Sequence, residues 1–147
     1  MRFKVGRVNS DQNPEVQVSM SLRTALKLDA VVTGANGAAY LVAAGPLEDL
    51  LGLSPALLRS IGAFLLLFSA AVWMVASRRQ VSASAALVVI AVNVLWAADS
   101  IAFLLSGLSD PTTFGGLWIV MQALVVAGFA ALQAATRGAA REQALAT

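Results

Sequence analysis

The chain has 147 residues, of which 59% are hydrophobic and 12% are charged, and its formal net charge is +2. Soluble domains carry about 25% charged residues, so this composition argues against an ordinary globular domain and against intrinsic disorder, and it indicates a membrane protein. The sequence contains no Cys and no His. Their absence argues against disulfides, iron–sulfur clusters, haem or transition-metal enzymes and Ser-His-Asp hydrolases.

The first residues of the chain differ from the rest. Residues 1–21 contain mixed charges, an Asn-Pro pair and few large apolar side chains. This pattern predicts a loose cytoplasmic N-terminal segment. Met20, within it, is an alternative site for the start of translation.

Four apolar blocks follow in residues 22–136. Each is close to the length of about 20 helical residues that crosses the hydrocarbon core of a bilayer. A backbone in lipid must satisfy its own polar groups, so the blocks are expected to be helices. The predicted fold class is therefore all-α, a bundle of four transmembrane helices with short loops. The predicted spans cover about residues 23–45, 55–77, 82–107 and 111–136, and residues 137–147 are predicted to form a short cytoplasmic tail.

Two of the predicted helices begin with specific signals. Ser54-Pro55 stands at the start of the second span and Asp110-Pro111 at the start of the fourth. Ser and Asp are favoured N-cap residues, and Pro is favoured at the first helical position. Both pairs are therefore predicted to be helix starts.

The basic residues are distributed asymmetrically about these spans. All ten Lys and Arg residues except Arg59 lie near the start of the first span or before it, in the loop at 78–79, or after the last span. Cytoplasmic loops are enriched in Lys and Arg, so both termini are expected in the cytoplasm (N-in, C-in), with loops 46–54 and 108–112 outside. No basic stripe is interleaved with aromatic residues, and no nucleic-acid partner is expected.

Polar side chains inside the predicted spans are the candidates for a functional site, because each is costly in lipid without a partner. On the first helix, Asp29 and Thr33 begin a polar stripe that continues through Asn36 and Tyr40. Their spacing keeps all four on one helical face. Asp29 lies near the cytoplasmic edge of the stripe, close to two basic residues.

Further polar residues are predicted to meet at one depth in the bilayer. If each helix is centred in the bilayer, Tyr40, Asp99 and Gln122 lie slightly to the external side of the midplane. Asn36 and Asn93 complete this buried polar layer. We expect Asp99 to point into the bundle, held by Tyr40 and Gln122. Two interpretations remain open: a structural hydrogen-bond network that fixes helix register, or a proton- or ligand-linked site.

Three segments of the chain carry a resemblance: LDAVVTGANGAAYLVAAGPLEDLLGL, PALLRSIGAFLLLFSAAVWMVA and VNVLWAADS. They resemble small four-span integral membrane proteins of actinobacterial type, over about residues 22–135. The resemblance implies a four-helix fold in the plasma membrane of a bacterium, and no activity. By size and number of spans the chain also resembles DoxX-like membrane proteins. The chain departs from the pattern of small multidrug exporters, because they have an acid at the centre of the first helix and this chain has Asn36 there.

Three functions are compatible with the sequence. The first is a non-enzymatic accessory, scaffold or regulatory bundle, which the lack of catalytic groups and of large loops favours. The second is a small proton-linked carrier that acts as a dimer through Asp99. The third is a lipid- or quinone-linked membrane enzyme. No catalytic residue, metal site or cofactor is expected, and the expected partners are the lipid bilayer and either a second copy or another membrane protein.

Overall fold

Five helices make up the part of the chain that the structure describes. The computed structural model describes the backbone of residues 14–146 and the side chains of residues 22–146. The helices are α1 (Pro14–Val42), α2 (Ala44–Leu51), α3 (Pro55–Ser77), α4 (Ala83–Ser106) and α5 (Thr113–Leu145). No strand occurs among these residues, and the predicted all-α class is confirmed.

The long helices are apolar enough to cross a membrane. The helices α3, α4 and α5 each qualify as a span, and the Leu22–Val42 part of α1 together with α2 qualifies as a fourth, bent by 97°. The chain is therefore a membrane-spanning protein with three or four candidate spans. The bounds of α3 are those predicted from Ser54-Pro55, and the Ser54 hydroxyl accepts a hydrogen bond from the Leu57 amide.

The first predicted span, residues 23–45, ends earlier than expected. The helix α1 stops at Val42, and α2 starts at Ala44 in a new direction. Pro46 explains the break, because in a continuous helix its ring would collide with the carbonyl of Val42 and its nitrogen could not donate. The third predicted span, residues 82–107, matches α4 closely, with Ser82 and Gly107 as its caps.

Both ends of the helical part extend beyond the predicted membrane domain. Residues 14–21 belong to α1, and residues 137–145 continue α5. Residues 14–21, predicted as a loose segment, are therefore helical, and the residues of the predicted tail continue the last helix. Pro14 suits the first turn of a helix, and the Ala-rich sequence after 136 has high helix propensity. The remaining residues of these two predicted segments, 1–13 and Thr147, lie outside the described part of the chain.

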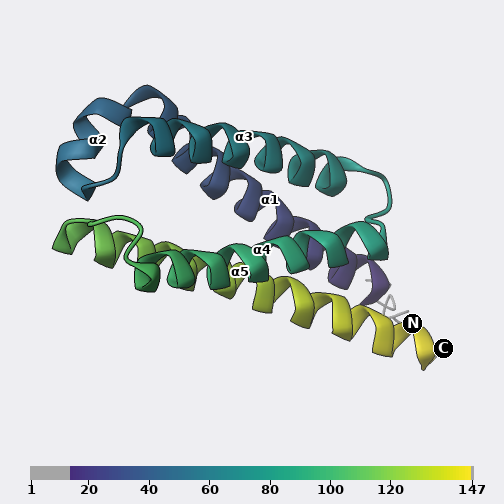
Figure 1. Cartoon of the computed structure of the whole chain (residues 1–147). Coiled ribbons are helices and arrows are strands. Elements are labelled where there is room, and N and C mark those ends of the chain that lie inside the picture. Colours follow the sequence, from purple (N-terminus) through teal and green to yellow (C-terminus); the bar gives the residue numbers. More distant parts are fainter. Residues whose placement is uncertain (1–13, 147) are drawn as a thin grey trace, which may run out of the picture.

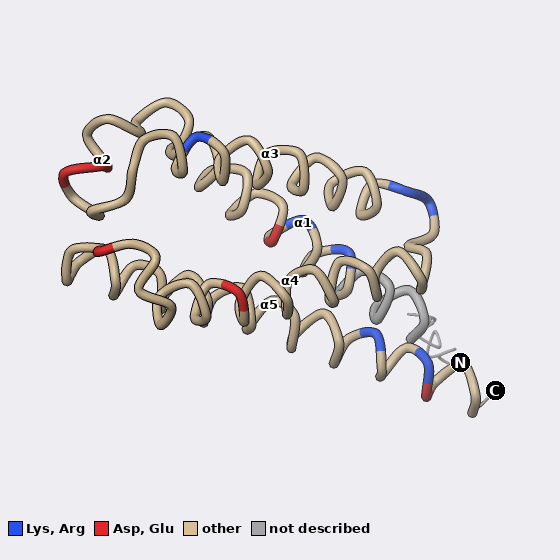
Figure 2. The backbone as a smooth tube through the Cα atoms, viewed as in Figure 1, with Lys and Arg blue, Asp and Glu red and all other residues tan. Residues whose placement is uncertain are grey.

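The long helices run antiparallel to their neighbours in the chain. The start of α1, the end of α5 and the loop between α3 and α4 lie at one end of the bundle, whereas α2 and the loop between α4 and α5 lie at the other (Figure 1). Most Lys and Arg residues lie at the first of these ends, whereas Glu48, Asp49 and Asp110 lie at the second together with Arg59 (Figure 2).

The short helix α2 is attached to the start of α5. The Thr112 amide donates to the Leu51 carbonyl at 3.0 Å, and the Thr112 hydroxyl donates to the Leu50 carbonyl at 2.6 Å. The same hydroxyl accepts from the Gly115 amide and caps α5. The cap of α5 is therefore Thr112 and not Asp110, as predicted, because the chain must first turn to meet the end of α2.

The helices α1 and α3 make the most extensive contact of any pair. Gly37 faces Gly62, and a Cβ atom on Gly62 would lie 2.7 Å from the Gly37 carbonyl oxygen. The Ser69 hydroxyl donates to the Ala30 carbonyl at 2.6 Å across the same interface. By contrast, α3 and α4 make few contacts although they are consecutive in the chain. The bundle is therefore loosely packed between α3 and α4.

Candidate functional site

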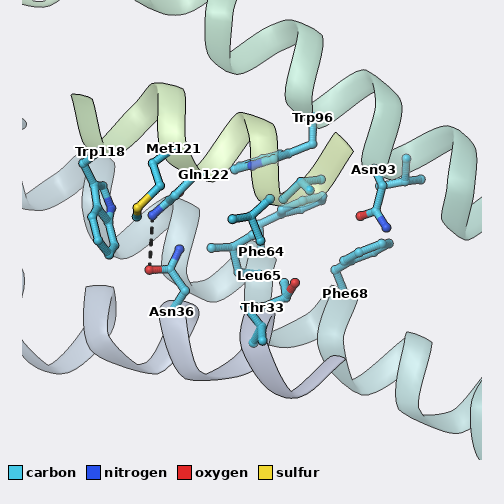
Figure 3. A pocket seen from close by; sticks show the side chains of 14 residues that line it. Thr33, Asn36, Phe64, Leu65, Phe68, Asn93, Trp96, Trp118, Met121 and Gln122 are labelled. Carbon is cyan, nitrogen blue, oxygen red and sulfur yellow. Dashed lines mark hydrogen bonds between the residues drawn. The ribbon is translucent and has the colours of Figure 1, made fainter. Parts of the chain in front are cut away.

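A cavity of about 320 Å³ lies among the four long helices. Its walls are mostly aliphatic and aromatic, with amide and hydroxyl groups in two places (Figure 3). The lining residues are Val32, Thr33, Asn36, Phe64, Leu65, Phe68, Val92, Asn93, Trp96, Trp118, Met121, Gln122, Val125 and Val126. No charged side chain lines it within the described residues, so the cavity suits an uncharged molecule.

The cavity is accessible from the side of the bundle. Val32, Phe64 and Met121 line it and are nevertheless exposed. All three lie well inside their helices, away from the loops at either end. In a membrane-spanning bundle this part of the surface faces acyl chains, so the cavity communicates with the lipid.

Aromatic side chains form the wall where α3 and α4 separate. Phe64 of α3 stacks on Trp96 of α4 with ring centroids 5.2 Å apart, and Phe64 and Phe68 stack at 6.2 Å. Such stacked pairs are favourable beyond the area they bury. The rings bridge a gap that the two helix backbones do not close.

One polar group of the site joins α1 to α5. The Gln122 amide nitrogen donates to the Tyr40 hydroxyl at 2.7 Å and to the Asn36 side-chain oxygen at 3.3 Å. The Trp118 indole nitrogen donates to the same Tyr40 hydroxyl at 2.9 Å. The structure therefore brings together three members of the predicted polar layer, and Asn36 and Gln122 present their amides to the cavity (Figure 3).

The second polar group surrounds Asp29, which is fully buried. One carboxylate oxygen of Asp29 accepts from Asn93 Nδ2 at 2.6 Å and from Gln133 Nε2 at 2.8 Å, and the other accepts from the Thr33 hydroxyl at 3.0 Å. Three helices thus converge on one carboxyl group. Thr33 and Asn93 also line the cavity, so this Asp29 cluster and the cavity share two residues.

The basic residues near Asp29 in the sequence are engaged elsewhere. The Arg23 guanidinium donates to the carbonyls of Arg78 and Arg79 in the loop between α3 and α4. The Lys27 ammonium lies 5.3 Å from the ring centroid of Trp73, a distance typical of a cation–π contact. The partners of the Asp29 carboxyl group among the described residues are therefore neutral.

Asp99 lies apart from both polar groups. It is exposed on α4, and the expectation that it points into the bundle and is held by Tyr40 and Gln122 is wrong. Asp99 lies six positions after Asn93, which at about 100° per residue places the two side chains about 120° apart around α4. Because Asn93 faces the core, Asp99 is directed to the surface.

Gln133 is a member of the Asp29 cluster that the sequence reasoning missed, since it lies close to the predicted cytoplasmic end of the fourth span. A signal for it exists. Gln133 follows Gln122 by eleven residues, which is close to three helical turns, so the two amides share one face of α5. Both therefore point to α1, one to each polar group.

The site can hold a molecule by hydrogen bonds and apolar contact. The described residues contain no group of three or more Asp and Glu side chains arranged to hold a metal ion. The cavity wall offers amides, a hydroxyl and indole rings, which bind neutral polar groups. Comparisons of the chain with known protein families, with curated proteins and with solved structures gave no match.

Proposed function

We propose that this chain crosses the plasma membrane of a bacterium four times, with both termini in the cytoplasm. The bent pair of α1 and α2 counts as one span in this proposal. The chain then crosses an even number of times, as it must, because α1 starts and α5 ends at the same end of the bundle (Figure 1). Support for the orientation comes from the charges: the basic residues gather at the end that holds the loop at 78–79 (Figure 2), and cytoplasmic ends are enriched in Lys and Arg.

Within that membrane, the proposed function is non-enzymatic: the bundle binds a neutral, lipid-like molecule that enters the cavity from the bilayer. The observation that carries this proposal is the cavity of about 320 Å³ in the side of the bundle. Ligand sites typically begin at about 300 Å³ and combine apolar walls with a few polar groups. Such a protein would serve as a sensor of the ligand or as an accessory subunit that presents it.

The walls indicate the chemistry of the ligand. Phe64, Phe68 and Trp96 offer ring faces to an acyl, prenyl or aromatic portion. The amides of Asn36, Asn93 and Gln122 can pair with a hydroxyl or carbonyl group. An uncharged wall in lipid disfavours an ionised head group, because nothing there would compensate its charge. The ligand is therefore expected to be a neutral amphiphile.

Tryptophan fluorescence tests this function directly, because Trp96 and Trp118 line the cavity whereas Trp73 does not. The protein, carrying Trp73→Phe, is reconstituted in unlabelled phospholipid vesicles, and a brominated long-chain alcohol is added at low mole fraction. A bound probe quenches the two cavity indoles. We expect quenching that saturates with probe concentration.

A matched pair of variants on α4 provides the control. Val92 lines the cavity, whereas Val94 is exposed on the other side of the helix. Val92→Phe fills the cavity and is expected to weaken binding about fivefold or more, since overpacking costs about 1–3 kcal/mol. Val94→Phe should leave binding unchanged. Equal saturable quenching in Val92→Phe and Val94→Phe would contradict the proposed function. So would quenching, in the protein with neither substitution, that rises only in proportion to the amount of probe in the lipid.

A further inference from the structure

We propose that Asp29 is a proton-binding site and that Asn93 couples its protonation to the cavity, so that pH decides which hydrogen-bonding group the cavity accepts. This inference rests on the proposed function, because it assigns a chemical selectivity to the same cavity. It follows from the position of Asn93, whose side chain belongs both to the cavity wall and to the Asp29 cluster.

In the geometry observed, the Asp29 carboxyl group acts only as an acceptor. Asn93 and Gln133 donate to one of its oxygens and Thr33 to the other. An ionised carboxylate is an acceptor without a proton to donate, and all three contacts fit that form. The Asn93 nitrogen is directed to Asp29, and the Asn93 side-chain oxygen is turned toward the cavity (Figure 3).

Addition of a proton to Asp29 changes this arrangement. A proton from the aqueous phase bonds to the oxygen that faces Asn93, and the carboxylate becomes a neutral carboxylic acid with one O–H donor. The new O–H then faces two amide donors, Asn93 Nδ2 and Gln133 Nε2, because both donate to this oxygen in the observed geometry. Rotation of both amides by half a turn resolves the conflict. The Asn93 oxygen then accepts from the acid, and Gln133 Nε2 donates to that oxygen in place of the present bond from Asn93 Nδ2 to Gln133 Oε1 at 3.4 Å. The same rotation turns the Asn93 nitrogen toward the cavity.

The cavity wall therefore has two states. With Asp29 ionised, Asn93 presents an oxygen, which accepts a hydrogen bond from a ligand hydroxyl. With Asp29 protonated, Asn93 presents an N–H group, from which a ligand carbonyl can accept a hydrogen bond. A ligand that has a carbonyl and no hydroxyl binds the protonated state better, so its affinity is expected to rise as the pH falls.

The charged groups around Asp29 are held by other partners or lie apart from it. On α1, Arg23 and Lys27 are held by loop carbonyls and by Trp73. On α5, Arg137 lies one turn beyond Gln133 toward the end of the bundle, and on α4 the exposed Asp99 lies about 9 Å along the axis from Asn93. The basic groups on α3 and after it, Arg59, Arg78 and Arg79, lie at the two ends of that helix.

The experiment compares two probes of matched chain length, a brominated long-chain alcohol and a brominated fatty acid methyl ester. Quenching of Trp96 and Trp118 is titrated with each in vesicles across a pH series, in protein carrying Trp73→Phe. We expect the ratio of ester affinity to alcohol affinity to increase about five- to tenfold from high to low pH, which corresponds to one net hydrogen bond.

Three variants test which residues cause the pH dependence of the affinity ratio. In Asp29→Asn the affinity ratio should no longer depend on pH, because the amide cannot titrate. Asn93→Ala should remove the pH dependence as well, and it carries the test should Asp29→Asn fail to fold. The exposed acid provides the control, since Asp99→Asn should keep the full pH dependence.

Each outcome separates the coupling from the proposed function. Saturable binding of both probes with a constant ratio at every pH overturns the coupling and leaves the proposed function standing. A pH-dependent ratio that persists in both Asp29→Asn and Asn93→Ala also overturns the coupling. Absence of saturable quenching by either probe at any pH overturns the proposed function, and the coupling with it.

Discussion

At the scale of single residues, the two acids inside the spans have opposite environments. Asp29 is fully buried and accepts hydrogen bonds from Thr33, Asn93 and Gln133. Asp99 is exposed on α4. Polar residues in a membrane segment are costly, and the cost is offset only where partners exist. The burial of Asp29 is therefore offset by three donors, and removal of the acid takes away the acceptor that they share.

We expect Asp29→Leu to lower the free energy of unfolding by about 1–3 kcal/mol, because buried donors that lose their acceptor pay their desolvation cost. Asp99→Leu serves as the matched control and should change stability by less than about 0.5 kcal/mol, as is usual for exposed positions. Reversible unfolding of both variants in the same detergent measures the difference. Equal destabilisation by the two substitutions would contradict the role assigned to the Asp29 cluster.

At the scale of helices, the contact between α2 and α5 depends on a glycine. A Cβ atom on Gly115 would collide with the backbone of Leu51, whereas a Cβ on the adjacent Gly116 would meet the Leu104 side chain at 3.8 Å. Gly115 is buried and Gly116 only partly so. The α2 helix can therefore rest on α5 only because the residue at 115 has no side chain.

We expect Gly115→Ala to displace α2 and to lower the free energy of unfolding by about 1–3 kcal/mol through overpacking. Gly116→Ala should be neutral or slightly stabilising, because Ala has the higher helix propensity. The chain has no native Cys, so a single cysteine in place of Leu51, a buried residue of α2, reports displacement by its rate of maleimide labelling. Unchanged labelling and stability in Gly115→Ala would contradict the proposed close contact.

At the scale of the whole molecule, the charges and the packing are both asymmetric. Lys and Arg lie mainly at the end that holds the loop between α3 and α4, and Glu48, Asp49 and Asp110 lie at the opposite end with α2 (Figure 2). The bundle is closed where α1 packs on α3 and α5, and it is loosely packed between α3 and α4. The first asymmetry supports the proposed orientation, and the second coincides with the cavity wall that Phe64 and Trp96 form.

Single cysteines test the orientation in intact cells. A membrane-impermeant maleimide is expected to label a cysteine in place of the exposed Glu48 on α2. It should not label a cysteine in place of Gln80, in the loop between α3 and α4, until the cells are opened. Both positions are exposed at the ends of the bundle, so each serves as the control for the other. Labelling of the Gln80→Cys variant in intact cells would reverse the proposed orientation.

Much of the fold was determined by the sequence alone. The lengths of α3 and α4 and their Ser caps follow from continuous apolar blocks and local capping signals, which act within a few residues. The convergence of Tyr40 and Gln122 also followed from helix rise and depth. The sequence did not place the cap of α5, because Thr112 is selected by its bonds to α2, a helix that is far away in the chain.

The selection of Asp29 over Asp99 as the buried acid was decided by the tertiary structure. Both residues are isolated acids in apolar helices, and periodicity alone does not say which face of α4 meets α5. That choice depends on how the helices rotate as they pack, which in lipid is governed by close contacts between small residues such as Gly37 and Gly62. Composition and charge therefore determined that the chain lies in a membrane, whereas the rotation of each helix about its axis decided which polar groups meet and where the cavity forms.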